Sequence, residues 1–253
     1  ALAPVFDGLH VNVRLNARDR VSYERVARFT SHSVQLVADS AFGLEPVEDT
    51  AIVQDADTWI SVERAAGRVV VGFNLHPMLL KNPTTAQIDA LIETAAETMR
   101  RMADRHMVSW LLIPHDTRGG MGDDACLLPL FQRLAPALGN HVKHLKGDPS
   151  AAELKGVAGL TDGVVTARMH LAIAALGQGV PVAAMVYQDK FRGLFGHFGL
   201  SDDLMIAPED MLGGPHYEAF VERFIQAMPS LRIKVQTMLP DVKALSRKNF
   251  SGI

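Results

Sequence analysis

From about residue 67 onward, short apolar stretches alternate with longer stretches in which apolar residues recur at helical spacing. RVVVGFNLH (68–76) and VSWLLIPHD (108–116) are rich in large and β-branched apolar residues, and TAQIDALIETAAETMRRMADRHM (85–107) lies between them. Strands that are apolar on both faces are typical of a parallel sheet covered by helices on two sides. The alternation therefore predicts a doubly wound α/β domain.

The same alternation continues to residue 228. It predicts further strands at 141–148, 163–167, 180–187 and 204–208, and further helices at 125–138, 150–160, 167–177, 191–200 and 216–228. Ser150, with Glu153 three positions later, has the pattern of a helix-capping box. Residues 67–253 are expected to form one Rossmann-like domain.

Residues 1–66 contain fewer elements than a complete α/β domain needs. The sequence predicts a strand running into a polar loop at 10–20, a short helix at 22–30, and a strand and turn at 34–42. We therefore expect residues 1–66 to be the remnant of an N-terminal α/β domain, with further residues preceding it in the full protein.

Charge and cysteine content argue against a general nucleic-acid-binding protein and against a protein stabilised by disulfides. Lys and Arg number 25 against 28 Asp and Glu, which gives a formal net charge of -3 and no basic excess for general nucleic-acid binding. A single cysteine, Cys126, allows no intrachain disulfide and is expected to be a buried small residue.

The most apolar run, 171–187, is interrupted at 177–181, and the chain begins without a signal-peptide pattern. We expect a cytoplasmic protein with at most peripheral membrane contact.

Polar and charged residues follow four of the predicted strands at the point where each strand ends. They are His76, His115, Asp116, Arg118, Arg168, His170, Asp189 and Lys190. The carboxyl ends of parallel strands meet at one edge of a sheet, where helix N-termini favour anions. Arg168 and His170 point to the same side if their segment is extended and diverge if it is helical. The sequence predicts an anion-binding site at this edge.

Ordinary structural roles are the alternative for many of these residues. Taken singly, the following histidines are expected to be plain polar or capping residues: His76, His141, His144, His197 and His216. His141 and His144 lack a third ligand at suitable spacing, so no metal site is expected. RGGMGDD (118–124) matches neither common nucleotide-binding pattern, and the structural alternative for its Asp123 and Asp124 is a solvated pair.

TDGVVTARMHLAIAALGQGVPVAAMVYQDKF (161–191) resembles the signature block of the polysaccharide pyruvyl transferase family. The shared pattern is Arg168-x-His170 at a helix start, then Gly-Val-Pro at 179–181, then a strand ending in Tyr187 with Lys190. Three further segments are similar to family segments and lie in the family's order: ARDRVSYERV (17–26), VADSAF (37–42), and WLLIPHD (110–116) with the acids at 123–124.

The resemblance implies a two-domain fold like that of GT-B glycosyltransferases, with the active site between the domains. It implies transfer of an enolpyruvyl-derived group from phosphoenolpyruvate to a sugar or glycan acceptor, free or lipid-linked, to form a ketal. In this scheme His170 is the general acid and Asp116, or next Asp123, is the general base. Arg168, Lys190, Arg18 and His115 bind the substrate, and no metal or other cofactor is required.

Two other functions are compatible with the same fold. One is a nucleotide-sugar glycosyltransferase or epimerase, which a nucleotide diphosphate rather than phosphoenolpyruvate would stabilise. The other is an inactive scaffold domain in glycan assembly, which neither ligand would stabilise.

Overall fold

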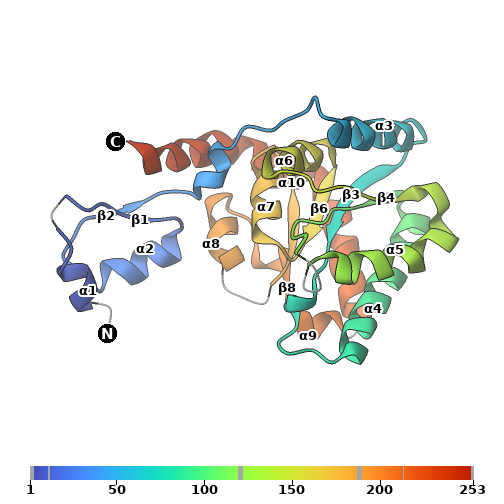
Figure 1. Ribbon diagram of the computed structural model, residues 1–253, viewed down its shortest axis with the longest axis horizontal. Helices are drawn as coiled ribbons and strands as arrows, with labels where there is room; N and C mark the ends of the chain where they lie inside the picture. Colours follow the sequence, from blue (N-terminus) through green and yellow to red (C-terminus); the bar gives the residue numbers. More distant parts are fainter. Residues whose placement is uncertain (1–2, 11, 119–121, 187–189, 213, 252–253) are drawn as a thin grey trace.

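The computed structural model describes residues 3–10, 12–118, 122–186, 190–212 and 214–251, and its main body is built on one six-stranded parallel sheet (Figure 1). The strands are β3 (Val69–Asn74), β4 (Val108–Leu112), β5 (Val142–His144), β6 (Gly163–Thr166), β7 (Val182–Met185) and β8 (Met205–Ile206). They lie in the order β5-β4-β3-β6-β7-β8. The predicted doubly wound α/β domain is confirmed.

Helices cover both faces of this sheet. They are α3 (Ala51–Ala65), α4 (Thr85–Arg105), α5 (Asp124–Leu138), α6 (Ala151–Leu160), α7 (Met169–Leu176), α8 (Lys190–His197), α9 (Pro208–Met211) and α10 (Pro215–Arg247). The chain crosses the sheet in one direction from β3 to β5 and in the other from β6 to β8. Because such crossovers are right-handed, α4 and α5 lie on one face and α6 and α7 on the other.

The buried core explains why the strands read as continuous apolar runs. Val71, Trp110 and Gly163 are in register on neighbouring strands and face the same side. The Trp110 indole packs edge-on against Phe73 at 6.1 Å and donates a hydrogen bond to the Met99 carbonyl of α4 at 3.0 Å. Burying both faces of every central strand leaves no polar face, so alternating polarity is absent.

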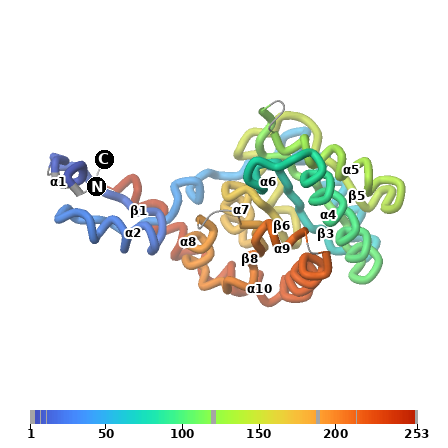
Figure 2. Tube along the Cα trace, turned by 90° about the horizontal axis from the view of Figure 1, so that it is seen from below, coloured from blue at the N-terminus to red at the C-terminus, as the bar shows by residue number. Residues whose placement is uncertain are grey.

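A small lobe projects from one side of the main body in both views (Figures 1 and 2). It contains α1 (Ala3–Asp7), the parallel strands β1 (Leu15–Ala17) and β2 (Val34–Leu36), and α2 (Arg20–Ala27). The two strands are shorter than the sequence predicts. The sequence analysis did not predict α3, whose buried residues, together with Phe42, join the core of the main body. The division of the chain at residue 66 stays a prediction.

The prediction that the last helix ends at residue 228 is wrong, because α10 continues through Pro229 and Pro240 to Arg247. Proline lacks an N–H and crowds the preceding turn, which is why it normally predicts a helix end. Here tertiary packing compensates: Val235 and Val242 are buried, and Ser246 Oγ donates to the Asp39 carbonyl at 2.9 Å. Despite this length, α10 is not apolar enough to cross a bilayer, and neither is any other described helix.

The segment that connects the small lobe to the main body is fixed against α6. Ser150 and Glu153 form the predicted capping box at the start of this helix. Lys155 is buried and donates to the carbonyls of Ala41 and Phe42 at the 3₁₀ turn η1 (Ser40–Gly43), and to that of Leu44. The connecting segment therefore passes over α6 at contact distance.

Two glycines of α6 offer a matched test of this contact. A methyl group at Gly156 would overlap the backbone carbonyl of Val47, whereas one at Gly159 would meet only the Gln178 side chain at 3.1 Å. Gly156→Ala should reduce the free energy of unfolding by about 2 kcal/mol, because backbone cannot move aside as a side chain can. Gly159→Ala should change it by less than about 1 kcal/mol, since alanine favours the helix. Equal melting temperatures for the two variants would contradict this packing.

Candidate active site

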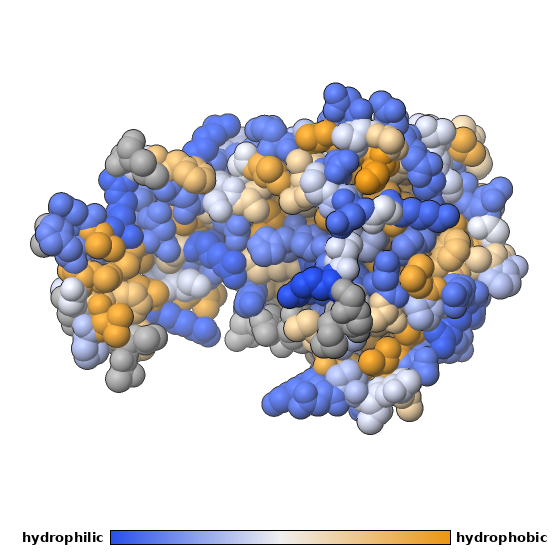
Figure 3. Space-filling model, in the orientation of Figure 1, coloured by the Kyte–Doolittle hydropathy of each residue, from blue (hydrophilic) through white to orange (hydrophobic). Residues whose placement is uncertain are grey.

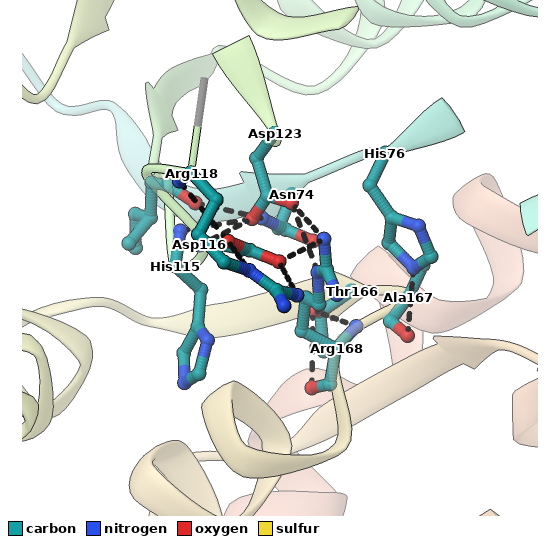
Figure 4. A network of polar contacts seen from close by, with 10 residues as sticks. Asn74, His76, His115, Asp116, Arg118, Asp123, Thr166, Ala167 and Arg168 are labelled. Atoms are coloured by element: carbon teal, nitrogen blue, oxygen red, sulfur yellow. Dashed lines mark hydrogen bonds and ion pairs between the residues drawn. The ribbon is translucent and has the colours of Figure 1, made fainter. Parts of the chain in front are cut away.

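The strand order reverses between β3 and β6, and this is where open α/β sheets form a crevice at the carboxyl ends of their strands. Asn74 is the last residue of β3, and Arg168, two residues after the end of β6, is the N-cap of α7. Asp123 precedes α5, the helix that follows β4. Figure 4 shows these three side chains converging from the three elements.

Asp123 lies at the centre of the network and is fully buried. Its Oδ2 accepts from the Asn74 amide at 2.7 Å and from the backbone N–H groups of His115 and Asp116 at 2.9 and 3.1 Å. Its Oδ1 accepts from Arg168 Nε at 2.9 Å and Nη2 at 2.6 Å. Both carboxylate oxygens are thus engaged, and the alternative of a solvated pair of Asp123 and Asp124 is wrong. Asp124 is half-exposed and pairs with His144 instead.

Arg168 is held in one geometry by two carboxylates. Besides its fork on Asp123, its Nη2 lies 3.2 Å from Asp116 Oδ2, and its backbone N–H donates to Thr166 Oγ1 at 2.9 Å. Arg168 itself is extended, and α7 begins at the next residue, so His170 is helical. The two side chains therefore diverge. The Arg168 side chain joins the buried network, and the His170 side chain is exposed at the pocket.

Asp116 links this network to the surface. The exposed Arg118 binds it through two contacts, Nε to Oδ1 at 2.9 Å and Nη2 to Oδ2 at 2.6 Å. These hydrogen bonds, with the nearby charge of Arg168, hold the pKa of Asp116 well below its usual range. Asp116 is therefore ionised and ion-paired at neutral pH.

His115 and His170 form a stacked pair of imidazoles. Their ring centroids are 6.2 Å apart and their planes differ by 11°. The His115 ring points away from the Asp123 carboxylate that its own backbone N–H contacts (Figure 4). Burial lowers the pKa of His115, and the neighbouring His170 and Arg168 lower it further against the opposing effect of Asp123. His115 is thus neutral at neutral pH.

A pocket of about 470 Å³ opens beside the imidazole pair. Six of the seven site residues predicted from sequence line it: Arg18, His115, Asp116, Arg168, His170 and Lys190. The seventh, Asp123, lies behind it against Arg168, and the remaining lining residues are Thr117, Arg118, Ala167, Met169 and Phe191. Their roles stay predictions. Tyr187 and Asp189 of the signature block lie outside the described residues.

Figure 3 shows hydrophilic residues over the middle of the molecule and a gathering of hydrophobic residues on the small lobe.

No group of three or more His, Cys, Asp or Glu side chains suited to a metal ion occurs among the described residues. Cys126 is buried as expected, and burial raises the pKa of its thiol to about 12.

Sequence analysis missed three participants in the network. Arg118 follows β4 and has no role predicted from the sequence, and Asn74, the one polar residue of the strand VVVGFN, is not among the predicted site residues. His76 was expected to be a plain polar residue. It is fully buried, with Nε2 3.4 Å from the Ala167 carbonyl, and burial together with the charge of Arg168 lowers its pKa to about 4.

Comparisons with known proteins agree on the family and the fold. The sequence profile of the family "polysaccharide pyruvyl transferase" matches residues 10–189. A comparison of the sequence with curated proteins finds no match. Three similar solved structures are HepE from Anabaena in complex with UDP-glucose (14% identity, TM-score 0.53), a putative UDP-N-acetylglucosamine 2-epimerase from Listeria monocytogenes (10%, 0.54), and the trehalose-6-phosphate phosphatase N-terminal domain from Candida albicans (12%, 0.52).

These structural likenesses concern the fold alone, because the identities are low. They cover 97%, 96% and 94% of this chain, in the same order, and 64%, 60% and 57% of the other chains. The chain thus spans about three fifths of the length of these structures. The predicted GT-B-like fold is confirmed.

Asp123 and Asp124 provide a matched pair for testing the buried network. Asp123→Ala leaves the Arg168 guanidinium buried without its bidentate partner and should cost about 3–5 kcal/mol of unfolding free energy. Asp124→Ala removes a half-exposed carboxylate from its pair with His144 and should cost less than about 1 kcal/mol. Urea unfolding of both variants measures the difference. Similar losses would show that Asp123 is not the centre of the network.

The lowered pKa of His76 predicts a specific pH dependence of stability. Between the ordinary value of 6.5 and about 4, the unfolded chain binds a proton at His76 that the folded chain does not. Stability should therefore fall as the pH falls through this range, by up to about 1.4 kcal/mol per pH unit from this group. His76→Gln should remove this contribution. Unfolding curves at pH 7.5, 6 and 5 test this, and parallel losses in the two proteins would contradict it.

Proposed function

The chain belongs to the polysaccharide pyruvyl transferase family, and from this premise we propose that its pocket binds phosphoenolpyruvate and transfers the pyruvyl group to two hydroxyls of a sugar, forming a ketal. The observation that supports this most is the pocket lining. Three arginines and one lysine, from four separate segments, line the same pocket of about 470 Å³ as a stacked pair of imidazoles.

Phosphoenolpyruvate has two anionic groups, a phosphate and a carboxylate, so its site needs several cations. Arg168 is the rigid one, since Asp123 and Asp116 fix its position. Lys190 and Arg118 are exposed at the pocket, and Arg18 reaches it from the small lobe. Guanidinium and ammonium groups bind phosphate and carboxylate through charge-assisted hydrogen bonds, and we assign these four side chains to the two anionic groups of the donor.

The reaction requires balanced proton transfers. The donor's methylene carbon gains a proton, and the cationic carbon that results is attacked by a first sugar hydroxyl, which loses its proton. A second hydroxyl of the same sugar then displaces inorganic phosphate, which departs with the proton of that hydroxyl, and the cyclic ketal is complete. A general acid and a general base near one another serve the first step, and imidazole has a suitable pKa for either role.

We assign the acid to His170, as the sequence analysis does, and the base to His115. The sequence analysis places Asp116 first as the base, but the lowered pKa of Asp116 makes it a weak proton acceptor. Asp123, the second choice, is buried with both oxygens engaged. His115 is neutral and lines the pocket, so it can accept the hydroxyl proton. Asp116 and Asp123 then act as positioning residues for the arginines.

Phosphate release from phosphoenolpyruvate, measured with a panel of free and lipid-linked sugar acceptors, tests this proposal. Release should require an acceptor and should fall about 10²–10⁴-fold in His170→Ala, because a positioned acid contributes that much. His216→Ala is the matched control: His216 is exposed and, like His170, is the second residue of its helix. Wild-type rates in Arg168→Ala and His170→Ala would refute the assignment.

Ligand stabilisation separates this proposal from its alternatives. Phosphoenolpyruvate should raise the melting temperature of the wild-type protein, and less so that of Lys190→Ala. A rise with UDP alone would favour a nucleotide-sugar glycosyltransferase or epimerase, in keeping with the fold. No rise with either ligand would favour a scaffold without activity.

A further inference from the structure

Arg18 is the one lining residue of the pocket that comes from the small lobe; every other described lining residue comes from the main body. It lies in the turn between β1 and α2, and its side chain is 41% exposed. Arg18 can bind a ligand in the pocket only if the small lobe is held in place. The contacts that fix the turn therefore determine where Arg18 lies in the site.

Helix α8 makes one of these contacts at its last residue. His197 Nε2 lies 2.8 Å from the backbone carbonyl oxygen of Arg18. Because a carbonyl oxygen only accepts, Nε2 carries a proton and donates it. The Arg18 side chain is held from the other side, where its Nη1 donates to Asp39 Oδ2 at 3.1 Å.

A second contact lies one helical turn earlier in α8. Asp19 is buried and caps α2, accepting from the backbone N–H of Ser22 at 2.7 Å and from its hydroxyl at 2.8 Å. A methyl group at Gly193 would lie 2.6–2.8 Å from Asp19 side-chain atoms, which is closer than carbon atoms approach. The turn that carries Arg18 and Asp19 thus sits directly on α8, and only glycine allows this approach.

We propose that His197 and Gly193 are positioning residues that hold Arg18 at the pocket. Helix α8 carries Lys190, a lining residue of the pocket, at its first position and His197 at its last. One short helix therefore sets the positions of two anion-binding side chains from different parts of the chain. This inference rests on the proposed function in that it takes the pocket's ligand to be the phosphorylated donor.

Loss of the histidine contact should affect donor binding rather than the chemical step. In His197→Ala, the KM for phosphoenolpyruvate should rise about tenfold, as in Arg18→Ala, because the charge-assisted contact of Arg18 with the donor is displaced. The kcat should change less than about twofold. The double variant should be no worse than Arg18→Ala alone. His197→Gln should restore most of the affinity, since its amide can donate to the same carbonyl. Additive effects in the double variant would overturn the inference.

Two glycines of α8 provide a matched control that does not alter a polar group. A methyl group at Gly196 meets no atom within 4 Å, whereas one at Gly193 meets Asp19. Gly193→Ala should raise the KM for phosphoenolpyruvate about tenfold or more, and Gly196→Ala should leave it unchanged. Equal KM values for these two variants, both folded by circular dichroism, would refute the role of Gly193.

Binding of inorganic phosphate, measured by calorimetry, keeps this inference separate from the proposed reaction. Phosphate should bind the wild-type protein and Gly196→Ala equally, and should bind His197→Ala and Arg18→Ala more weakly by a similar factor. That result without turnover of phosphoenolpyruvate would support the positioning role and reject the reaction. Turnover with unchanged phosphate binding and unchanged KM in His197→Ala would support the reaction and reject the positioning role.

Discussion

The buried ion pair between Asp123 and Arg168 is the interaction on which the rest of the site depends. Removing both charges from water is costly, and the cost is offset only where hydrogen bonds satisfy the remaining polar groups. Here Asn74 and two backbone N–H groups complete the shell of Asp123. Because these partners come from the ends of β3, β4 and β6, the pair ties together three strands at the point where their order reverses. The loop that carries His115 and the start of α7, which carries His170, are fixed as a consequence.

This arrangement divides the cations of the site into two kinds. Arg168 is neutralised by carboxylates and serves as rigid framework as well as lining. Arg18 and Lys190 reach the pocket from its rim, and both depend on helix α8 for their positions. A pocket for a small anionic donor needs both: a fixed charge that costs no reorganisation when the ligand binds, and exposed charges that can close on it. Lys155, buried under the connecting turn η1, fixes the segment that joins the two parts.

Much of the fold was predictable from the sequence, and the failures have specific causes. The six strands of the main sheet and the helices α4 to α8 follow from local periodicity, and the Ser150–Glu153 capping box from four residues alone, whereas the four-residue helix α9 does not. The length of α10 could not be predicted because Pro229 and Pro240 oppose it locally, and only the burial of Val235 and Val242 against the main body outweighs them. Asp123 was misjudged for a related reason: its solvation depends on Arg168, 45 positions away.

By itself, the sequence determined the α/β class, the family, and which residue types stand where strands end. These are local properties, since periodicity and short motifs are fixed by neighbours along the chain. Only the tertiary structure decided how those residues divide their tasks. Arg168 and His170 are two positions apart, yet one enters a buried network and the other stacks on His115, because α7 begins between them. His197, plain in sequence, contacts Arg18 across 179 positions. Such contacts depend on how the two parts of the chain pack, which no local pattern records.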